Sequence, residues 1–163
     1  MKTNGSPTNA PNCAGRRFAI VAALFYRELS DKLVDGARRA LRDCDVADAD
    51  ISIYEVPGCF ELPLACRNLI DAKNLDAVVA LGVVIRGETP HFDYVAGECA
   101  RGIMDVQLMT GVPIGFGVLT TENAAQAEER ADPKRGDKGY EAAIAAATLL
   151  HLNDASPRAG FRS

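Results

Sequence analysis

Short runs of apolar residues alternate along the chain with longer segments in which apolar side chains recur every three or four positions. The continuous runs at residues 18–24 and 77–84 are typical of strands buried on both faces of a parallel sheet. Residues 51–56 alternate apolar and polar side chains, which predicts a strand that is less fully covered. Residues 113–119 form the fourth predicted strand.

Helical periodicity follows each predicted strand. Apolar residues spaced three and four apart predict helices at residues 30–44, 60–72, 90–110, 123–130 and 138–152. Ser30 is the candidate cap of the first helix, and Gly111 is a natural stop for the third. Pro63 fits its helix only because it falls within the first turn. The last helix has an alanine-rich face, which predicts close packing on its neighbours.

A strand followed by a helix, repeated four times with one extra helix, predicts an α/β fold. The expected architecture is a three-layer α/β/α sandwich around a four-stranded parallel sheet. We expect one domain at residues 17–152, a loosely attached arm at residues 1–16 and a loose tail at residues 153–163. Functional residues in such sheets lie beyond the carboxyl ends of the strands. These ends are residues 25–28, 57–61, 85–91 and 120–123.

Composition narrows the classes of function. The 163 residues carry a net charge of -4 and contain no tryptophan, which disfavours a basic or aromatic surface for nucleic acid and a basic surface for membranes. The five cysteines lack Cys-x-x-Cys spacing and the two histidines are far apart, so we expect reduced thiols and no metal centre. Residues 1–14 lack the apolar core of a signal peptide, and no apolar run has the length of a membrane span. We therefore expect a cytoplasmic protein.

The most informative segment is residues 85–91, which leave the most apolar strand and enter a helix. Thr89 suits the cap position and Pro90 the first helical position, while Gly87 lets a ligand approach the backbone. Free N–H groups at a helix start favour an anion such as phosphate, and His91 could act as a base beside it. A structural histidine in a helix cap would explain the same residues, so this segment alone leaves both interpretations open.

Other strand ends carry further candidate residues. Glu61 follows a Pro-Gly turn with free amides, although stabilisation by the helix dipole alone would explain a carboxylate there. Phe25 follows the first strand, where an aromatic ring belongs either to the core or to the edge of a site. Arg130 suits phosphate recognition and precedes a basic loop without the spacing of a nucleotide P-loop. The strand at 113–119 lacks a complete dinucleotide fingerprint, so we expect no NAD.

Taken together, these segments resemble the lumazine synthase (6,7-dimethyl-8-ribityllumazine synthase) family. Two of the matching stretches are Val56-Pro-Gly-Cys-Phe-Glu-Leu-Pro63 and Ile85-Arg-Gly-Glu-Thr-Pro-His91. The others are residues 17–25, 80–84, 92–94, 111–121, 129–131 and 138–139. They span residues 16–152 in unbroken order, and several ordered motifs are far more specific than any single one. The resemblance implies a flavodoxin-like fold and no metal or organic cofactor.

The resemblance also implies a reaction, in which a transferase of riboflavin biosynthesis condenses 5-amino-6-(D-ribitylamino)uracil with 3,4-dihydroxy-2-butanone 4-phosphate. The products are 6,7-dimethyl-8-ribityllumazine, phosphate and water. Because the substrate's own amine is the nucleophile, the protein orients two substrates and moves protons. By matching position, His91 is the expected proton-transfer residue, and Glu88, Thr89 and Arg130 are the expected phosphate-binding residues. The matched positions for the remaining substrate groups are Phe25, Cys59, Phe60, Glu61, Val83, Val84, Ile85, Phe116 and Lys138.

The resemblance further implies self-association into pentamers. In the family, the positions of Phe116, Arg130 and Lys138 come from the neighbouring subunit, so the active sites are expected between subunits. The short loop between Arg130 and Lys138 favours an icosahedral shell of pentamers. Tyr26, Cys59 and Glu88 depart from residues common in the family, which bears on substrate affinity more than on the reaction.

Two alternatives remain at the level of the sequence. The first is a non-catalytic relative that binds a flavin or lumazine, or that only builds a shell. The second is a flavodoxin-like electron carrier, which would follow from the fold class alone. The absence of tryptophan and of a Ser/Thr-rich phosphate loop after the first strand disfavours the electron carrier.

Overall fold

A computed structural model describes residues 10–155 of the chain. The four strands found there are β1 (Phe18–Ala23), β2 (Ile51–Val56), β3 (Ala77–Ile85) and β4 (Ile114–Thr121). They pair in parallel in the order β2-β1-β3-β4 and form one sheet. The strands expected from the apolar runs are therefore confirmed, and β2, which alternates in polarity, lies at an edge of the sheet and is only half-buried.

Five α-helices are described, and their bounds lie close to those predicted. They are α1 (Arg27–Asp43), α2 (Leu62–Lys73), α3 (His91–Thr110), α4 (Ala124–Ala131) and α5 (Lys138–Ala155). Pro63 occupies the first turn of α2, and Gly111 ends α3 in the left-handed conformation, as predicted. Single turns of 3-10 helix at Asp48–Asp50 and Cys59–Glu61 complete the regular elements.

Ser30 does not cap α1, so this prediction is wrong. The helix begins three residues earlier, at Arg27, and Ser30 is fully buried within its first turn. The Ser30 hydroxyl donates a hydrogen bond to the carbonyl oxygen of Ala23 at 2.5 Å. Its polar group therefore ties the helix to the end of β1 and does not satisfy a free amide of the helix.

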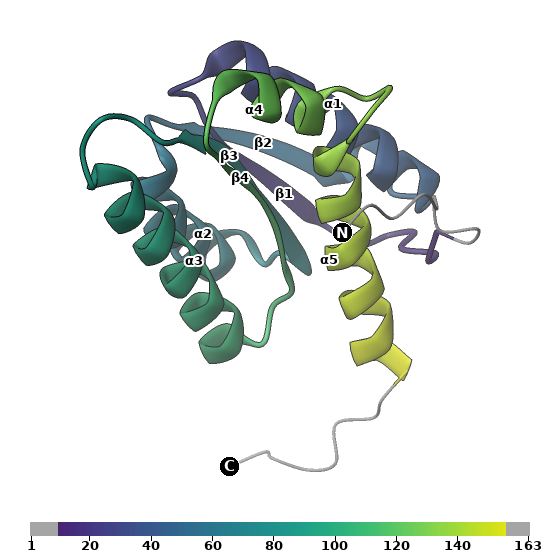
Figure 1. The fold of residues 1–163 in the computed structure, drawn as a ribbon. Helices are drawn as coiled ribbons and strands as arrows, with labels where there is room; N and C mark the ends of the chain where they lie inside the picture. Colours follow the sequence, from purple (N-terminus) through teal and green to yellow (C-terminus); the bar gives the residue numbers. More distant parts are fainter. Residues whose placement is uncertain (1–9, 156–163) are drawn as a thin grey trace.

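The helices cover both faces of the sheet, which confirms the three-layer α/β/α sandwich (Figure 1). Helices α1, α4 and α5 pack on one face, and α2 and α3 pack on the other. Strand β1 is buried along its whole length, as is β3 up to Val84, which explains their continuous apolar sequences. Helix α5 lies so close to β4 that a Cβ at Gly115 would overlap the carbonyl group of Ala142.

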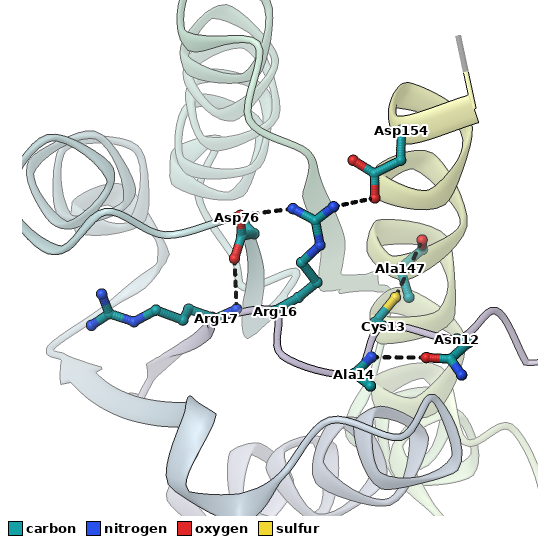
Figure 2. A network of polar contacts seen from close by, with 8 residues as sticks. All are labelled: Asn12, Cys13, Ala14, Arg16, Arg17, Asp76, Ala147 and Asp154. Carbon is teal, nitrogen blue, oxygen red and sulfur yellow. Dashed lines mark hydrogen bonds and ion pairs between the residues drawn. The ribbon is translucent and has the colours of Figure 1, made fainter. Parts of the chain in front are cut away.

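Residues 10–16 of the predicted arm lie against the domain (Figure 2). The buried Cys13 donates its backbone N–H to the carbonyl oxygen of Cys44 at 2.7 Å. The Arg16 guanidinium pairs with Asp76 at 3.4 Å and with Asp154 at 2.6 Å. Because α5 continues to Ala155, Asp154 belongs to the helix, although the sequence predicts a loose tail from residue 153.

The remainder of the predicted arm and tail, residues 1–9 and 156–163, lies outside the described residues. All five cysteines are free and buried, as the sequence predicted. Among the helices of residues 10–155, none is both long enough and apolar enough to cross a membrane.

Candidate functional site

A hollow of about 420 Å³ opens where β1, β2 and β3 end. It brings together seven of the residues predicted from the sequence, which are Phe25, Cys59, Phe60, Glu61, Val83, Val84 and His91. A larger hollow, of about 560 Å³, lies between α1 and α4 and is lined by none of the predicted site residues. The chemistry therefore points to the smaller hollow, at the edge of the sheet where parallel α/β folds bind ligands.

Two aromatic rings stand in solvent at the rim of this hollow. Phe25 is 76% exposed and Phe60 is 60% exposed. The alternative in which Phe25 is a core residue is therefore wrong. Exposed large apolar side chains that gather around one concavity mark a binding surface for an apolar or aromatic ligand.

The turn after β2 forms one wall of the hollow. Gly58 has an extended backbone, and Cys59–Glu61 then form a single 3-10 turn that leads into α2. The Cys59 thiol points inwards and donates a weak hydrogen bond to the carbonyl oxygen of Val83 at 3.8 Å. Burial raises the pKa of this thiol to about 11, so it is neutral at physiological pH. Cys59 is therefore a packing residue of the wall, while the Glu61 carboxylate is exposed at its rim.

The end of β3 forms the floor of the hollow and offers a backbone edge without a strand partner. Strand β3 pairs with β1 only as far as Leu81, whereas on its other side it pairs with β4 as far as Ile85. Beyond Leu81, the side of β3 that faces away from β4 therefore has no strand partner, and on it the Val83 carbonyl oxygen accepts only the weak hydrogen bond of the Cys59 thiol. Buried backbone N–H and C=O groups need hydrogen-bonding partners, so this edge suits a planar ligand with amide-like groups.

The turn between β3 and α3 lies beside this edge. Helix α3 begins at His91 with Pro90 at its N-cap, one residue later than the predicted start with Thr89 as cap. The Thr89 hydroxyl nonetheless accepts a hydrogen bond from the backbone N–H of His91 at 3.4 Å. Glu88 and Thr89 are exposed and lie outside the lining of the hollow, as does the half-buried Ile85. His91 is exposed and belongs to that lining.

The three remaining predicted residues line a second hollow of about 400 Å³. Phe116 comes from the edge strand β4, Arg130 from the end of α4 and Lys138 from the start of α5. Arg130 donates to the carbonyl oxygen of Gln126 at 3.1 Å, and Lys138 pairs with Glu141 at 2.6 Å. A single chain therefore holds ten of the predicted site residues in two groups, with His91 in one and both basic side chains in the other.

The first hollow also contains residues that the sequence analysis missed. Tyr94 and Val95 of α3 line it, together with Gly58. Tyr94 is 69% exposed and lies three residues after His91, which places both on one face of the helix. Helical spacing from His91 would have identified Tyr94, because positions i and i+3 are neighbours on a helix surface.

The chemistry available in the first hollow is binding and proton transfer. Exposed rings and an open strand edge suit a flat heterocycle, and the amides at the start of α3 suit an anion. The imidazole of His91 can take up or release a proton between these two places. The buried, neutral thiol of Cys59 is a poor nucleophile.

Comparison with known proteins identifies the relatives of this chain. A family model described as 6,7-dimethyl-8-ribityllumazine synthase matches residues 15–154. A protein of that name from Desulfotalea psychrophila (strain LSv54 / DSM 12343) is 49% identical over 141 residues, which are 86% of this chain and 91% of the relative. Its namesake from Chlorobium phaeobacteroides (strain DSM 266 / SMG 266 / 2430) is 47% identical over 138 residues, which are 85% of this chain and 89% of the relative.

Proposed function

Because this chain belongs to the 6,7-dimethyl-8-ribityllumazine synthase family, we propose that the hollow at the end of β3 is its substrate site. The protein is a transferase of riboflavin biosynthesis. It condenses 5-amino-6-(D-ribitylamino)uracil with 3,4-dihydroxy-2-butanone 4-phosphate to give 6,7-dimethyl-8-ribityllumazine.

One observation carries the assignment of the site. The backbone edge of β3 beyond Leu81 has no strand partner on the side where the exposed rings of Phe25 and Phe60 stand. A uracil ring has a flat apolar face and an edge of alternating N–H and C=O groups. The rings would stack on its face, and Val83, Val84 and Ile85 would hydrogen-bond its edge. Glu61 and the backbone of the Cys59–Glu61 turn would bind the hydroxyl groups of the ribityl chain.

The phosphorylated ketone would lie at the start of α3. Backbone N–H groups at Gly87, Glu88 and Thr89 and the positive end of the helix dipole would bind its phosphate. The exposed Glu88 carboxylate can point into water, so only its backbone needs to face the anion. This arrangement places the reacting carbons beside His91, between the phosphate and the uracil amine.

The reaction then needs orientation and proton transfer. The uracil amine attacks the ketone carbon, and loss of one water gives an imine. Elimination breaks the carbon–oxygen bond to phosphate, and ring closure on the second nitrogen releases another water. His91 would take protons from the nitrogen and carbon centres and return one to departing water. The uracil amine is itself the nucleophile, so the enzyme does not need to activate a nucleophilic side chain. Holding the two substrates together therefore supplies the larger share of the rate enhancement.

We further propose that each site is completed by a neighbouring subunit of a pentamer. Arg130 and Lys138 lie in the second hollow, apart from His91, although phosphate recognition calls for basic side chains. In a closed ring, the second hollow of one subunit meets the first hollow of the next through a head-to-tail interface. Phe116, Arg130 and Lys138 would then lie over the substrates, and such pentamers could form a shell. Five free, buried cysteines support a reducing compartment, so we propose the cytoplasm.

A direct assay tests the proposed function. The purified protein is mixed with both substrates, and lumazine fluorescence is followed against the spontaneous condensation. We expect a rate well above that background, and a rate equal to it would exclude the enzyme activity. The non-catalytic alternative is not favoured by the named relatives, but tight riboflavin binding without product formation would support it. Phe25→Ala should raise KM for the uracil substrate, because its stacking surface is lost.

A further inference from the structure

Arg86 follows β3 directly and contacts two other segments of the chain. Its Nε donates to the Glu122 carboxylate at 2.9 Å, and its Nη1 donates to the Asp93 carboxylate at 3.1 Å. Its guanidinium also lies over the ring of Phe92, 4.2 Å from the centroid. The backbone N–H of Arg86 donates to the carbonyl oxygen of Thr121 at 2.9 Å. One residue thus joins the end of β3 to the end of β4 and to the first turn of α3.

The turn that Arg86 borders has few contacts of its own. Gly87 through Pro90 are exposed, and a Cβ placed on Gly87 would have no neighbouring atom within 4 Å. The hydrogen bond between His91 and Thr89 is long, at 3.4 Å. The position of this turn is therefore set mainly by its two ends. Arg86 holds one end and reaches to Phe92 and Asp93 at the other.

We propose that Arg86 is a positioning residue of the condensation, which holds the Gly87–Pro90 turn and the first turn of α3 in one fixed arrangement. This inference rests on the proposed function of the turn. With Arg86 in place, the amides of the turn and the imidazole of His91 face the phosphorylated substrate together. Without Arg86, the two ends of the turn are no longer linked. The amides that bind the phosphate and the imidazole that transfers protons are then less well aligned with the substrate.

A direct contact between Arg86 and the phosphate is the main alternative. The geometry disfavours it, because Nε and Nη1 already donate to two carboxylates whose charges offset that of the guanidinium. The two roles respond differently to the loss of Glu122. If Arg86 acts through this carboxylate, Glu122→Gln should impair the reaction. If Arg86 binds phosphate, Glu122→Gln should free its donors and improve use of the phosphorylated substrate.

Steady-state kinetics on Arg86→Gln, Glu122→Gln and the double variant test the inference. We expect Arg86→Gln to lower kcat and to raise KM for the phosphorylated substrate, each by about tenfold, because small misplacements in such sites cost one to two orders of magnitude. KM for the uracil substrate should stay within about twofold, since the aromatic rim is untouched. Inhibition by inorganic phosphate should weaken in parallel with KM for the phosphorylated substrate. Glu122→Gln should show a smaller effect of the same kind, and the double variant should be no worse than Arg86→Gln.

Controls separate this role from general damage and from failure of the proposed function. Arg42 also pairs with a carboxylate, that of Asp48, but this pair lies away from the site. Arg42→Gln should therefore leave the kinetics unchanged. Arg86→Lys should recover only part of the activity, because one ammonium group cannot donate to both carboxylates with the fixed geometry of a guanidinium. An inactive wild type would refute the proposed function itself. With an active wild type, unchanged kinetics of Arg86→Gln, additive effects in the double variant, or improved phosphate binding in Glu122→Gln would each overturn the positioning role.

Discussion

The thiol of Cys59 lies 3.8 Å from the carbonyl oxygen of Val83, which joins the turn after β2 to the end of β3. These two residues come from separate strand ends and form adjoining surfaces of the same hollow. Gly82, which precedes Val83, lies so close to the sulfur atom that an added Cβ would clash with it. The shape of the first hollow therefore depends on one close contact between a small residue and a thiol.

This contact predicts a pair of compensating substitutions. A Cβ at Gly82 would lie 2.5 Å from the Cys59 sulfur and 3.1 Å from the Cβ of Ala23, so Gly82→Ala overfills the wall. We expect Gly82→Ala to lower the free energy of unfolding by about 1–3 kcal/mol, the usual cost of overpacking. Cys59→Ala removes the sulfur, so the double variant should be more stable than the sum of the two single losses.

Urea unfolding of the four proteins measures this coupling. Activity should follow the same order, because the clash would displace the wall next to the substrate. Strictly additive losses would show that the clash is relieved elsewhere, for example by movement of β1 at Ala23. Cys66→Ala serves as the matched control, because Cys66 is buried on the same face of the sheet and is not among the near neighbours of the added Cβ.

The fold was predictable because its signals are local and repeated. The continuous apolar runs of β1 and β3 follow directly from burial on both faces, and Gly111 marks the end of α3. Element ends were less predictable, because they depend on contacts between segments. Ser30 has the right chemistry for a cap, yet its hydroxyl bonds to Ala23, and no pattern within the helix contains that contact.

The gathering of most matched positions at one edge of the sheet was predictable from the sequence, but their division between two hollows was not. Seven matched positions gather in one hollow because they follow strand ends that meet at one edge of the sheet. The separation of Arg130 from His91 depends on where β4 and α4 lie in three dimensions, which local patterns do not encode. The exposure of Phe25 was also not predictable, since an aromatic residue after a buried strand can belong to the core or to the surface, and its neighbours in space decide which.

Buried thiols predict a loss of stability in alkali. Burial raises the pKa of Cys59 to about 11 and the pKa values of Cys44, Cys66 and Cys99 to about 12. The unfolded chain releases these thiol protons from about pH 9, whereas the folded chain retains them, so unfolding becomes more favourable as pH rises. Each such thiol should cost about 1.4 kcal/mol of stability at pH 10 relative to neutral pH.

Urea unfolding at pH 7.5 and pH 10 measures this loss. Cys66→Ala should reduce the difference between the two pH values, whatever it does to stability at neutral pH, because one titrating group is removed. An unchanged difference would mean that the Cys66 thiol ionises equally in the folded and unfolded states. Ellman's reagent gives an independent check, since thiols that stay protonated and buried at pH 8 should react slowly until the chain unfolds.

The contacts of Asp76 predict how residues 10–17 are held (Figure 2). One carboxylate oxygen accepts from the backbone N–H of Arg17 at 2.7 Å, and the other accepts from the Arg16 guanidinium at 3.4 Å. Asp76→Ala should lower the free energy of unfolding by about 1–2 kcal/mol, because a charged acceptor for a backbone amide is lost. Asp71→Ala, which breaks only the exposed pair with Arg67 at 3.9 Å, should cost less.

Salt separates the two contacts of Asp76. The ion pairs of the half-buried Arg16 should weaken as salt rises, whereas the hydrogen bond to the Arg17 amide should persist. Arg16→Ala should therefore cost little at high salt, and Asp76→Ala should still cost most of its original amount. Equal losses for Asp76→Ala and Asp71→Ala would contradict a special role of the Arg17 contact. Urea unfolding at low and high salt provides the comparison.

The two hollows predict that defective subunits can repair each other. His91→Ala should lower kcat, because proton transfer is lost while orientation remains, and Arg130→Ala should raise KM for the phosphorylated substrate. Suppose that each site takes His91 from one subunit and Arg130 from its neighbour. When equal amounts of the two variants are unfolded and refolded together, random assembly in a ring should then restore about a quarter of the sites. At low phosphorylated substrate, the rate of this mixture should clearly exceed the mean of the two variants. The same mixture without unfolding should show no gain, and a jointly refolded mixture that only matches the mean would place His91 and Arg130 in sites of a single chain.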